Sequence, residues 1–197
     1  MCRTLVLKRI YIGIDLAAKE SRCSGFAYIV CRDVCRIEES RCMYRDDDIL
    51  NAIAKLCTDE HSIYISIDAP FSLGIGMRKI DKKMLSMGFR VFPPGFSYMR
   101  LLTARAANIL NRLRMVGVVN VYETHPRSTI INSGCSSVRE LLKRLNIEYN
   151  INVDRLNRDL SDAIICAAVS YCIDNGCYIK IEEVDGVIWL IDRICAS

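Results

Sequence analysis

Acidic side chains end three apolar stretches of this chain, at positions where chemistry is possible. The acids are Asp15, Asp68 and Glu123, which close the stretches 10–15, 62–68 and 118–123. Stretches of this length and composition are typical of strands that are covered on both faces. In an open α/β sheet, sites form beyond the carboxyl ends of parallel strands, so we expect these acids to converge. A fourth acid, Asp162, falls in the first turn of an otherwise apolar predicted helix.

A cluster of carboxylates requires a counter-charge. Acids packed together repel one another, which costs stability and raises their pKa values. A divalent cation removes this cost, and an all-oxygen ligand set favours Mg²⁺ or Mn²⁺. Two such ions, about 3.5–4 Å apart, are the usual clamp for in-line attack on a phosphodiester. The pattern therefore predicts a two-metal nuclease acting on DNA or RNA. Its metal ligands, which are also its catalytic residues, would be Asp15, Asp68, Glu123 and Asp162, with Asp15 bridging the ions.

Each acid also has a purely structural explanation. Asp and Glu at a strand end often cap a turn or the following helix. Asp162 alone is typical of an acid at the positive end of a helix. Asp159 lies one helical turn earlier, on the same face, and competes with Asp162 as the fourth ligand. Only the coincidence of all four acids favours a site.

Basic side chains near these acids are candidates for substrate binding. We expect Lys19, Arg78 and Arg127 to meet phosphate oxygens or the charge that develops in the transition state. His125 has two interpretations: it transfers a proton, or it is a strand-end histidine bonded to the backbone.

The segment 78–116 is predicted to be mainly helical and is rich in Lys and Arg. These basic side chains either bind a nucleic-acid backbone or form an ordinary solvated face. Phe92, Phe96 and Tyr98 flank a Pro-Pro-Gly loop inside it. These rings either stack on an unpaired base or seal the segment onto the core.

The order of the remaining elements predicts the fold class. Strands at 10–15, 25–30 and 34–38 form an antiparallel meander, with a hairpin turn between the last two. Later strands alternate with helices, of which the last runs from 159 to 175 and ends at Gly176. A pair of strands at 178–181 and 187–191 closes the chain. This order is typical of a mixed α/β sheet with helices on both faces.

Composition indicates an ordinary globular protein. The chain has 197 residues, 51% of them apolar, with a formal net charge of +4. We expect one domain, 1–197, with a helical insertion at about 74–116. The charge permits a polyanionic substrate. No uncharged stretch reaches the ~18 residues of a membrane span, and Lys8 and Arg9 interrupt the apolar run near the N-terminus. We therefore expect a cytoplasmic protein without membrane contact.

The 11 cysteines contain no Cys-x-x-Cys pair, which argues against structural zinc. Most are expected to be small buried apolar residues, such as Cys57, Cys166 and Cys172. Cys31 and Cys35 flank the predicted hairpin turn and could be bridged in a thermophile's cytosol, but we expect them to be unpaired.

Several motifs, in order, resemble the family called domain of unknown function 429. They are Gly13–Lys19 with Ser24–Ala27, Ile67–Leu73, Arg78 with Asp81, Phe92–Gly95 with Met99, Glu123–Arg127, and Asp162–Ala163. The resemblance covers about residues 10–175. It implies an RNase H-like fold with five strands in the order 3-2-1-4-5, the Asp15 strand central and the Asp68 and Glu123 strands parallel beside it. Because that family is described as a predicted nuclease, the resemblance also implies this activity.

Two other functions fit the pattern. Actin-like and sugar-kinase domains use a related sheet with an acid after the first strand, which implies a phosphotransferase or ATPase. Such proteins normally contain two copies of the domain, whereas this chain has one and lacks a Gly-rich P-loop. The third function is a non-catalytic module that binds nucleic acid or protein through the basic insertion. The sequence indicates neither the oligomeric state nor the choice between DNA and RNA.

Overall fold

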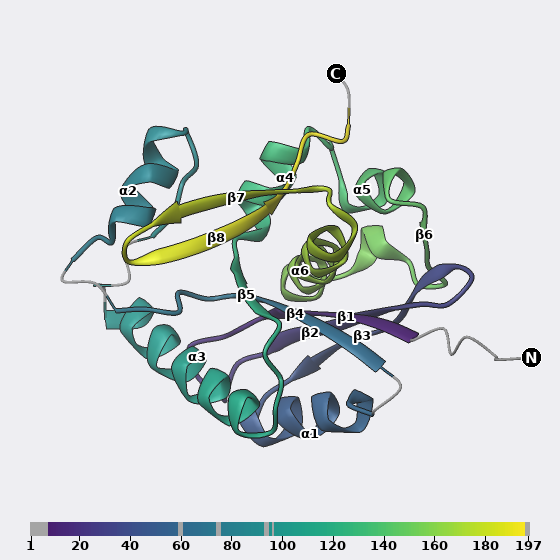
Figure 1. The fold of residues 1–197 in the computed structure, drawn as a ribbon, viewed down its shortest axis with the longest axis horizontal. Helices are drawn as coiled ribbons and strands as arrows, with labels where there is room; N and C mark the ends of the chain where they lie inside the picture. Colours follow the sequence, from purple (N-terminus) through teal and green to yellow (C-terminus); the bar gives the residue numbers. More distant parts are fainter. Residues whose placement is uncertain (1–7, 59–60, 74–75, 93–94, 96, 196–197) are drawn as a thin grey trace, which may run out of the picture.

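The computed structural model describes residues 8–58, 61–73, 76–92, 95 and 97–195. In this part of the chain, eight strands form one sheet in the order β6-β3-β2-β1-β4-β5-β8-β7 (Figure 1). The strands are β1 (Lys8–Asp15), β2 (Ser24–Cys31), β3 (Cys35–Met43), β4 (His61–Asp68), β5 (Val121–Thr124), β6 (Ile147–Glu148), β7 (Tyr178–Glu183) and β8 (Gly186–Ile191).

The middle of the sheet has the predicted order, but the predicted number of strands is wrong. The run β3-β2-β1-β4-β5 corresponds to 3-2-1-4-5, with β1, β4 and β5 parallel and β2 antiparallel to β1. Beyond β5 the sheet continues into the β8–β7 hairpin, which joins β5 through the single pair Thr124 and Trp189. Beyond β3 it continues into the two-residue strand β6. Pairings this short leave little trace in a sequence pattern.

Helices cover both faces of the sheet (Figure 1). They are α1 (Asp46–Leu56), α2 (Lys79–Ser86), α3 (Ser97–Met115), α4 (Pro126–Ser133), α5 (Val138–Arg144), the 3-10 turn η1 (Val153–Arg155) and α6 (Arg158–Asn175). Helices α1 and α3 lie on one face, and α4, α5 and α6 on the other. The predicted insertion at 74–116 therefore contains α2 and α3. Phe96 of its Pro-Pro-Gly loop, with residues 93–94, lies outside the described residues.

Helix α4 follows β5 directly and begins at Pro126. The proline opens the helix, where its missing N–H is not needed. His125 caps this helix, since its Nδ1 accepts a hydrogen bond from the Ser128 backbone N–H. Gly134 ends it in the left-handed conformation, with φ of 74°.

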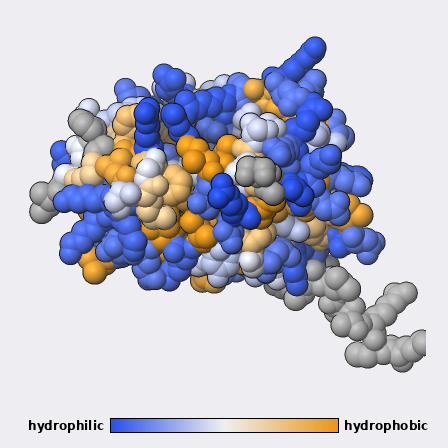
Figure 2. Space-filling model, turned by 90° about the horizontal axis from the view of Figure 1, so that it is seen from above, coloured by the Kyte–Doolittle hydropathy of each residue, from blue (hydrophilic) through white to orange (hydrophobic). Residues whose placement is uncertain are grey.

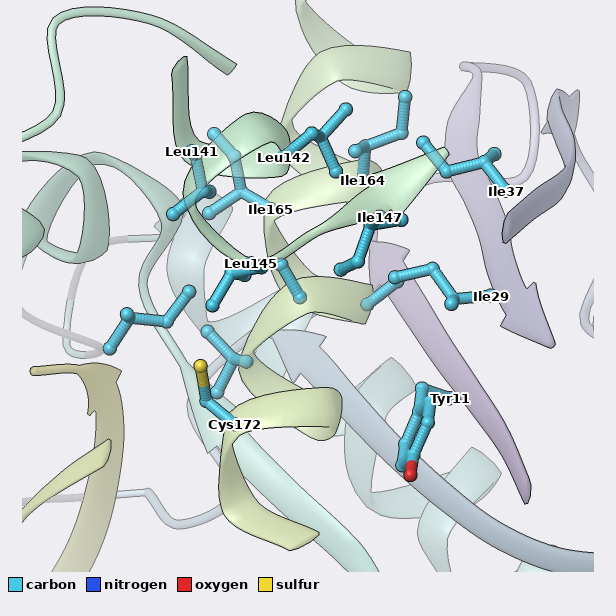
Figure 3. Close-up of a cluster of buried hydrophobic side chains, with 14 of the residues drawn as sticks. Tyr11, Ile29, Ile37, Leu141, Leu142, Leu145, Ile147, Ile164, Ile165 and Cys172 are labelled. Carbon is cyan, nitrogen blue, oxygen red and sulfur yellow. The ribbon is translucent and has the colours of Figure 1, made fainter. Parts of the chain in front are cut away.

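Helix α6 is the centre of the core on its face of the sheet. Figure 3 shows Ile164, Ile165 and Cys172 of this helix among side chains from α5 and from strands β1 to β3. The α6 residues Ala163 to Ser170 are all buried. The helix thus matches the predicted apolar segment, and its first turn is held at the end of β1.

Two glycines allow α6 to approach the sheet this closely. A Cβ atom added to Gly13 of β1 would overlap the backbone oxygen of Ala163 and the backbone nitrogen of Ala167. A Cβ added to Gly25 of β2 would overlap the backbone oxygen of Asp159. Because these overlaps are with backbone atoms, no rotamer change would relieve them. The glycines therefore fix the distance between α6 and the strand that ends at Asp15.

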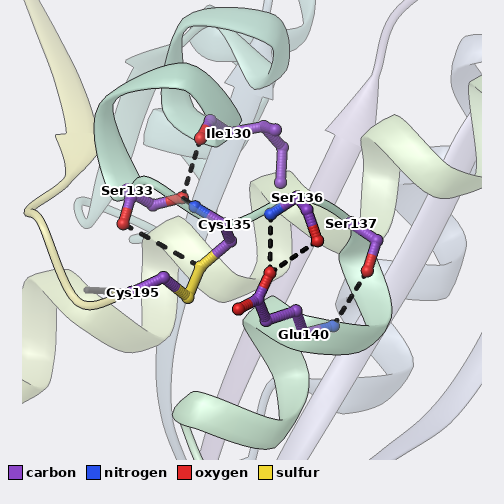
Figure 4. Close-up of a disulfide and its surroundings, with 7 residues drawn as sticks. All are labelled: Ile130, Ser133, Cys135, Ser136, Ser137, Glu140 and Cys195. Atoms are coloured by element: carbon purple, nitrogen blue, oxygen red, sulfur yellow. Dashed lines mark hydrogen bonds between the residues drawn. A yellow bond between two sulfur atoms is a disulfide. The ribbon is translucent and has the colours of Figure 1, made fainter. Parts of the chain in front are cut away.

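The expectation of mostly unpaired cysteines is wrong. Four disulfides are present in the described part of the chain: Cys23–Cys42, Cys31–Cys35, Cys135–Cys195 and Cys172–Cys177. Cys31 and Cys35 are direct partners across the β2–β3 hairpin. Cys135–Cys195 joins the segment after α4 to the chain beyond β8 (Figure 4), a pairing that depends on the tertiary fold. Cys57 and Cys166 remain free.

The face that carries α2, α4 and the β7–β8 hairpin mixes apolar and hydrophilic surface. Figure 2 views this face and shows apolar side chains near its middle, bordered by hydrophilic ones. Beneath it, Ile80 and Met84 of α2 pack against Ile181, Ile188 and Leu190 of the hairpin. Among the described residues, no helix is long and apolar enough to cross a membrane.

Arg105 anchors the predicted insertion to the sheet. Its side chain is 7% exposed and extends from α3. The Nε donates to Asp46 of α1 at 2.6 Å, and Nη2 to the Tyr44 carbonyl at 2.8 Å. Nη1 donates to the Ala17 carbonyl at 2.7 Å and to the Ser24 hydroxyl at 3.2 Å. One guanidinium therefore joins α3, α1 and the β1–β2 connection.

We expect Arg105→Met to lower the free energy of unfolding by about 2 kcal/mol, because it leaves buried acceptors without a donor. Arg112→Met provides the matched control, since Arg112 joins the same two helices through Asp47 with side chains 44% and 71% exposed. That exposed pair should contribute less than about 1 kcal/mol. Urea unfolding of both variants measures the difference, and equal losses would contradict the anchoring role of Arg105.

Candidate metal-binding active site

Asp15 and Asp68 lie side by side at the carboxyl ends of the central parallel strands. They are direct partners in the register of β1 and β4. Alternation along β1 places Asp15 on the face of Tyr11 and Gly13, which is the face covered by α6. Asp68 lies on the same face, because Ser66, two residues earlier, hydrogen bonds to Ser170 of α6 at 2.8 Å. The sheet therefore brings these two carboxylates together.

Asp162 joins them from the first turns of α6. Its charge raises the pKa values of both Asp15 and Asp68, so it lies close to both. Asp159 also raises the pKa of Asp15, though less than Asp162 does. Asp159 is not among the carboxylates that raise the pKa of Asp68. Of the two competing acids, Asp162 has the larger effect on the pKa values of the pair.

Burial and mutual repulsion make the ionised form of these acids costly. Burial is the main cause that raises the pKa of Asp15 to about 7, and repulsion by Asp162 comes next. Burial, followed by the charge of Asp15, raises the pKa of Asp68 well above its usual value. Burial also raises the pKa of Asp162, although Arg158 opposes this shift. Within the described residues, no hydrogen-bond donor stabilises the carboxylates of Asp15 and Asp68.

Glu123 follows the neighbouring strand but points to the other face of the sheet. Its register partner on β4 is Ile67, whereas the partner of Asp68 is Thr124. Because side chains alternate along a strand, this difference of one residue directs Glu123 away from the face of Asp68, although Glu123 still lines the same cavity as Asp15 and Asp68. Glu123 is still close enough to Asp68 to raise its pKa.

Arg78 occupies both oxygens of the Glu123 carboxylate. It donates from Nη2 to Oε1 at 2.6 Å and from Nη1 to Oε2 at 3.1 Å. Its remaining donors bind Asp81 and the Ser72 hydroxyl, and the residue is 3% exposed. Glu123 also accepts the Phe71 backbone N–H at 2.8 Å. Arg78 and Glu123 thus form a buried ion pair that holds α2 against the end of β5.

His125 borders the same cavity as the aspartates. Its Nδ1 accepts the backbone N–H of Ser128, which leaves the proton of the neutral ring on Nε2. Burial lowers the pKa of His125 to about 4, with help from the positive charges of Arg127 and Arg158. The ring is therefore neutral near pH 7. The backbone-bonded arrangement is present, and only Nε2 remains for a ligand.

The other predicted substrate-binding residues lie at the edge of the site or outside it. Lys19 and Arg127 are exposed and do not line the cavity. The basic segment 78–116 is partly structural, since Arg78 and Arg105 are buried.

Sequence reasoning missed Arg158, which lines the cavity and bonds to Asp162 at 3.3 Å. The spacing Arg-x-x-x-Asp at the start of a predicted helix was the available signal.

The cavity at this end of the sheet is lined by both charged and apolar side chains. It measures about 220 Å³. Its charged lining includes Asp15, Asp68, Glu123 and Arg158, and its apolar and aromatic lining includes Val91, Phe92, Tyr98, Met99 and Leu102. Phe92 is 74% exposed and Tyr98 51% exposed. The acids of this lining suit a cation, and the exposed rings of Phe92 and Tyr98 suit a flat apolar group.

The donor chemistry of the aspartates suits a hard divalent cation. Asp15 and Asp68 supply adjacent carboxylate oxygens that face a cavity, and their repulsion is the feature that a cation relieves. As the side chains stand, however, no group of three His, Cys, Asp or Glu residues in the described ranges is arranged to hold a metal ion. Asp162 is turned to Arg158, so it would have to exchange that partner for the cation.

Comparison with known proteins extends only to the fold. No protein-family model matches the chain, so the resemblance to domain of unknown function 429 stays a prediction, and no curated protein matches it. Among solved structures, the chain is similar to T. thermophilus RuvC in complex with a Holliday junction substrate. The TM-score is 0.51 at 10% identity, over 85% of this chain and 96% of that one. This likeness concerns the fold alone: the chain has a mixed α/β sheet covered by helices, similar to that of RuvC, and the mixed α/β class is the one that the order of the elements predicts.

Proposed function

We propose that this protein is a nuclease that hydrolyses phosphodiester bonds with the help of Mg²⁺ or Mn²⁺. The observation that carries the proposal is the register pair Asp15 and Asp68, which face one cavity without hydrogen-bond donors. Structural acids at strand ends normally cap a backbone N–H or pair with a cation. These two half-buried side chains do neither within the described residues, and a bound cation is the simplest compensation for their mutual repulsion.

In this proposal Asp15, Asp68 and Asp162 hold the metal. A bound divalent ion would polarise the phosphate and generate a hydroxide nucleophile near neutral pH. Asp15 and Asp68, which line the cavity, would hold such an ion there, and Asp162 would join them after leaving Arg158. Glu123 remains with Arg78 and keeps α2 in place. The two-ion arrangement then needs oxygens from the substrate phosphate for the second ion, as is common for Mg²⁺.

The proposed substrate is a nucleic acid. The RuvC structure with its Holliday junction is the reason to test branched DNA first. The aromatic lining of the cavity also supports a nucleic-acid substrate, because Phe92 and Tyr98 can stack on a base that is not paired. His125 offers its Nε2–H as a hydrogen-bond donor beside them.

The proposal is tested by incubating the purified protein with four-way-junction, duplex and single-stranded DNA and with matched RNA. Each substrate is assayed with Mn²⁺, with Mg²⁺ and with EDTA. We expect cleavage of at least one substrate with either ion, none in EDTA, and loss of cleavage in Asp68→Asn. Asp33→Asn is the control, since Asp33 is an exposed acid in the β2–β3 turn, at the opposite end of the sheet. Hydrolysis of a nucleoside triphosphate without nucleic-acid cleavage would instead support a phosphotransferase-type activity.

We also expect Mn²⁺ to stabilise the folded protein, because the ion relieves repulsion that exists only in the folded state. At a concentration one hundred times its dissociation constant, a ligand stabilises by about 2.7 kcal/mol. For a chain of this length that corresponds to an increase in Tm of roughly 5–10 °C. Differential scanning fluorimetry measures the shift. Asp68→Asn should lose most of it and Asp33→Asn none, and an equal shift in all three proteins would indicate non-specific binding.

A further inference from the structure

Arg158 is the one guanidinium at this cavity, within the described residues, that still has donors to offer. Two arginines line the cavity, Arg78 and Arg158. Arg78 is buried and fully used by Asp81, Glu123 and Ser72. The Arg158 side chain is 78% exposed, and only its Nε donates, to Oδ2 of Asp162 at 3.3 Å. Its two Nη groups have no protein partner in the described part of the chain.

The position of Arg158 is fixed by the start of α6. It is the first residue of the helix, directly after Asn157, whose side chain caps the helix by accepting the Leu160 N–H at 2.9 Å. From there its positive charge acts on both strand-end acids: it lowers the pKa of Asp15 and of Asp68. The guanidinium therefore lies within electrostatic reach of the whole acidic cluster.

We propose that Arg158 is a catalytic residue that contacts the substrate phosphate, and that Asp162 holds its guanidinium at the site until a divalent cation takes Asp162. The inference rests on the proposed nuclease function. Without a metal, three crowded carboxylates attract a positively charged side chain, and the exposed Arg158 is bonded to one of them. Once a metal ion occupies them, the guanidinium is released beside a phosphodiester whose non-bridging oxygens match its fork of donors.

The ordinary alternative is a surface ion pair within one helix. An i,i+4 pair of this exposure contributes little to stability and has no effect on metal binding or catalysis. The two interpretations predict different effects of Arg158 on the affinity for the metal. If Arg158 competes with the cation for Asp162, its removal should make the metal bind more tightly in the absence of nucleic acid.

The experiment compares Arg158→Ala and Arg158→Lys with Arg155→Ala, an exposed arginine of η1 that does not line the cavity. Isothermal titration with Mn²⁺ alone should give roughly two- to fivefold tighter binding for Arg158→Ala, the size of one exposed ion pair. Cleavage with saturating Mn²⁺ should fall about a hundredfold, mainly in kcat, as for loss of one transition-state donor. Arg158→Lys should restore less than a tenth of the lost rate, since lysine has no bidentate fork. Arg155→Ala should match the wild type in both measurements.

The outcomes distinguish a failure of the proposed role of Arg158 from a failure of the proposed nuclease function. If the wild-type protein cleaves and Arg158→Ala cleaves equally well, the role of Arg158 is wrong and the nuclease remains. Mn²⁺ binding that is unchanged or weaker in Arg158→Ala would also overturn the exchange at Asp162. If the wild-type protein cleaves no substrate with any divalent ion, the proposed function fails and the role of Arg158 fails with it.

Discussion

Replacing Asp15 by asparagine is expected to reduce Mn²⁺-dependent cleavage by about a thousandfold or more, the equivalent of several kcal/mol of metal-derived transition-state stabilisation. Asp15 ends the central strand and interacts electrostatically with both Asp68 and Asp162. Its loss should therefore weaken the binding of a metal ion more than the loss of any other ligand. Single-turnover cleavage with saturating Mn²⁺ measures the loss. A preparation of Asp15→Asn that retains wild-type cleavage would show that the metal site is wrongly assigned.

The same substitution should stabilise the folded protein when no metal is bound. The pKa of Asp15 is raised to about 7 in the folded protein, so the folded state binds the proton more tightly than the unfolded chain does. Stability contributed by the protonated form is therefore lost as the pH rises toward and through 7. At pH 8 in EDTA, Asp15→Asn should have a higher Tm than the wild type, because asparagine carries no charge. Loss of activity with a gain in stability distinguishes a functional acid from a structural one.

Gly13→Ala is expected to destabilise the protein by at least about 3 kcal/mol, at the upper end of the cost of overpacking. The added Cβ would overlap backbone atoms of Ala163 and Ala167, so α6 would have to move away from β1. That movement separates the Asp162 helix from Asp15. We therefore expect weaker Mn²⁺ binding as well as a lower denaturation midpoint, both measurable on the purified variant.

Gly117→Ala is the matched control for this substitution. Gly117 has a φ of 82° and nothing within 4 Å of an added Cβ. Alanine there should cost only the backbone strain of about 1 kcal/mol and leave Mn²⁺ binding unchanged. If Gly13→Ala proved as stable as Gly117→Ala, the contact between α6 and β1 would not be what positions the site.

Local patterns predicted that Asp15 and Asp68 would come together, whereas the central order of the sheet was implied by the resemblance to domain of unknown function 429. Buried parallel strands are continuous apolar runs, and an acid at the end of each run is visible without coordinates. The long α6 helix with its glycine cap was equally evident, because its pattern is strong over 17 residues. The short strand β6 and the β5–β8 junction were not, since each depends on a few backbone pairs formed between distant segments.

Glu123 illustrates what the pattern of strand ends leaves open. The acid is present at the predicted place, but the register of β5 against β4 pairs it with Ile67 and not with Asp68. With a side-chain period of two, that single step sends it to the other face, where Arg78 binds it. Register is set by contacts along the whole sheet, which no single strand encodes.

By itself, then, the sequence determined the residue types of the proposed cation site and the strands that carry them, because hydrophobic periodicity and strand ends are local properties. The tertiary structure decided which acids share a face, that Arg78 is an internal partner of Glu123, and that Arg158 stands beside Asp162. It also decided all four disulfides, including the Cys31–Cys35 hairpin pair that we expected to be unpaired. These are relations between side chains brought together by strand register and by the close packing of α6 on two glycines, and neither is a property of any one segment.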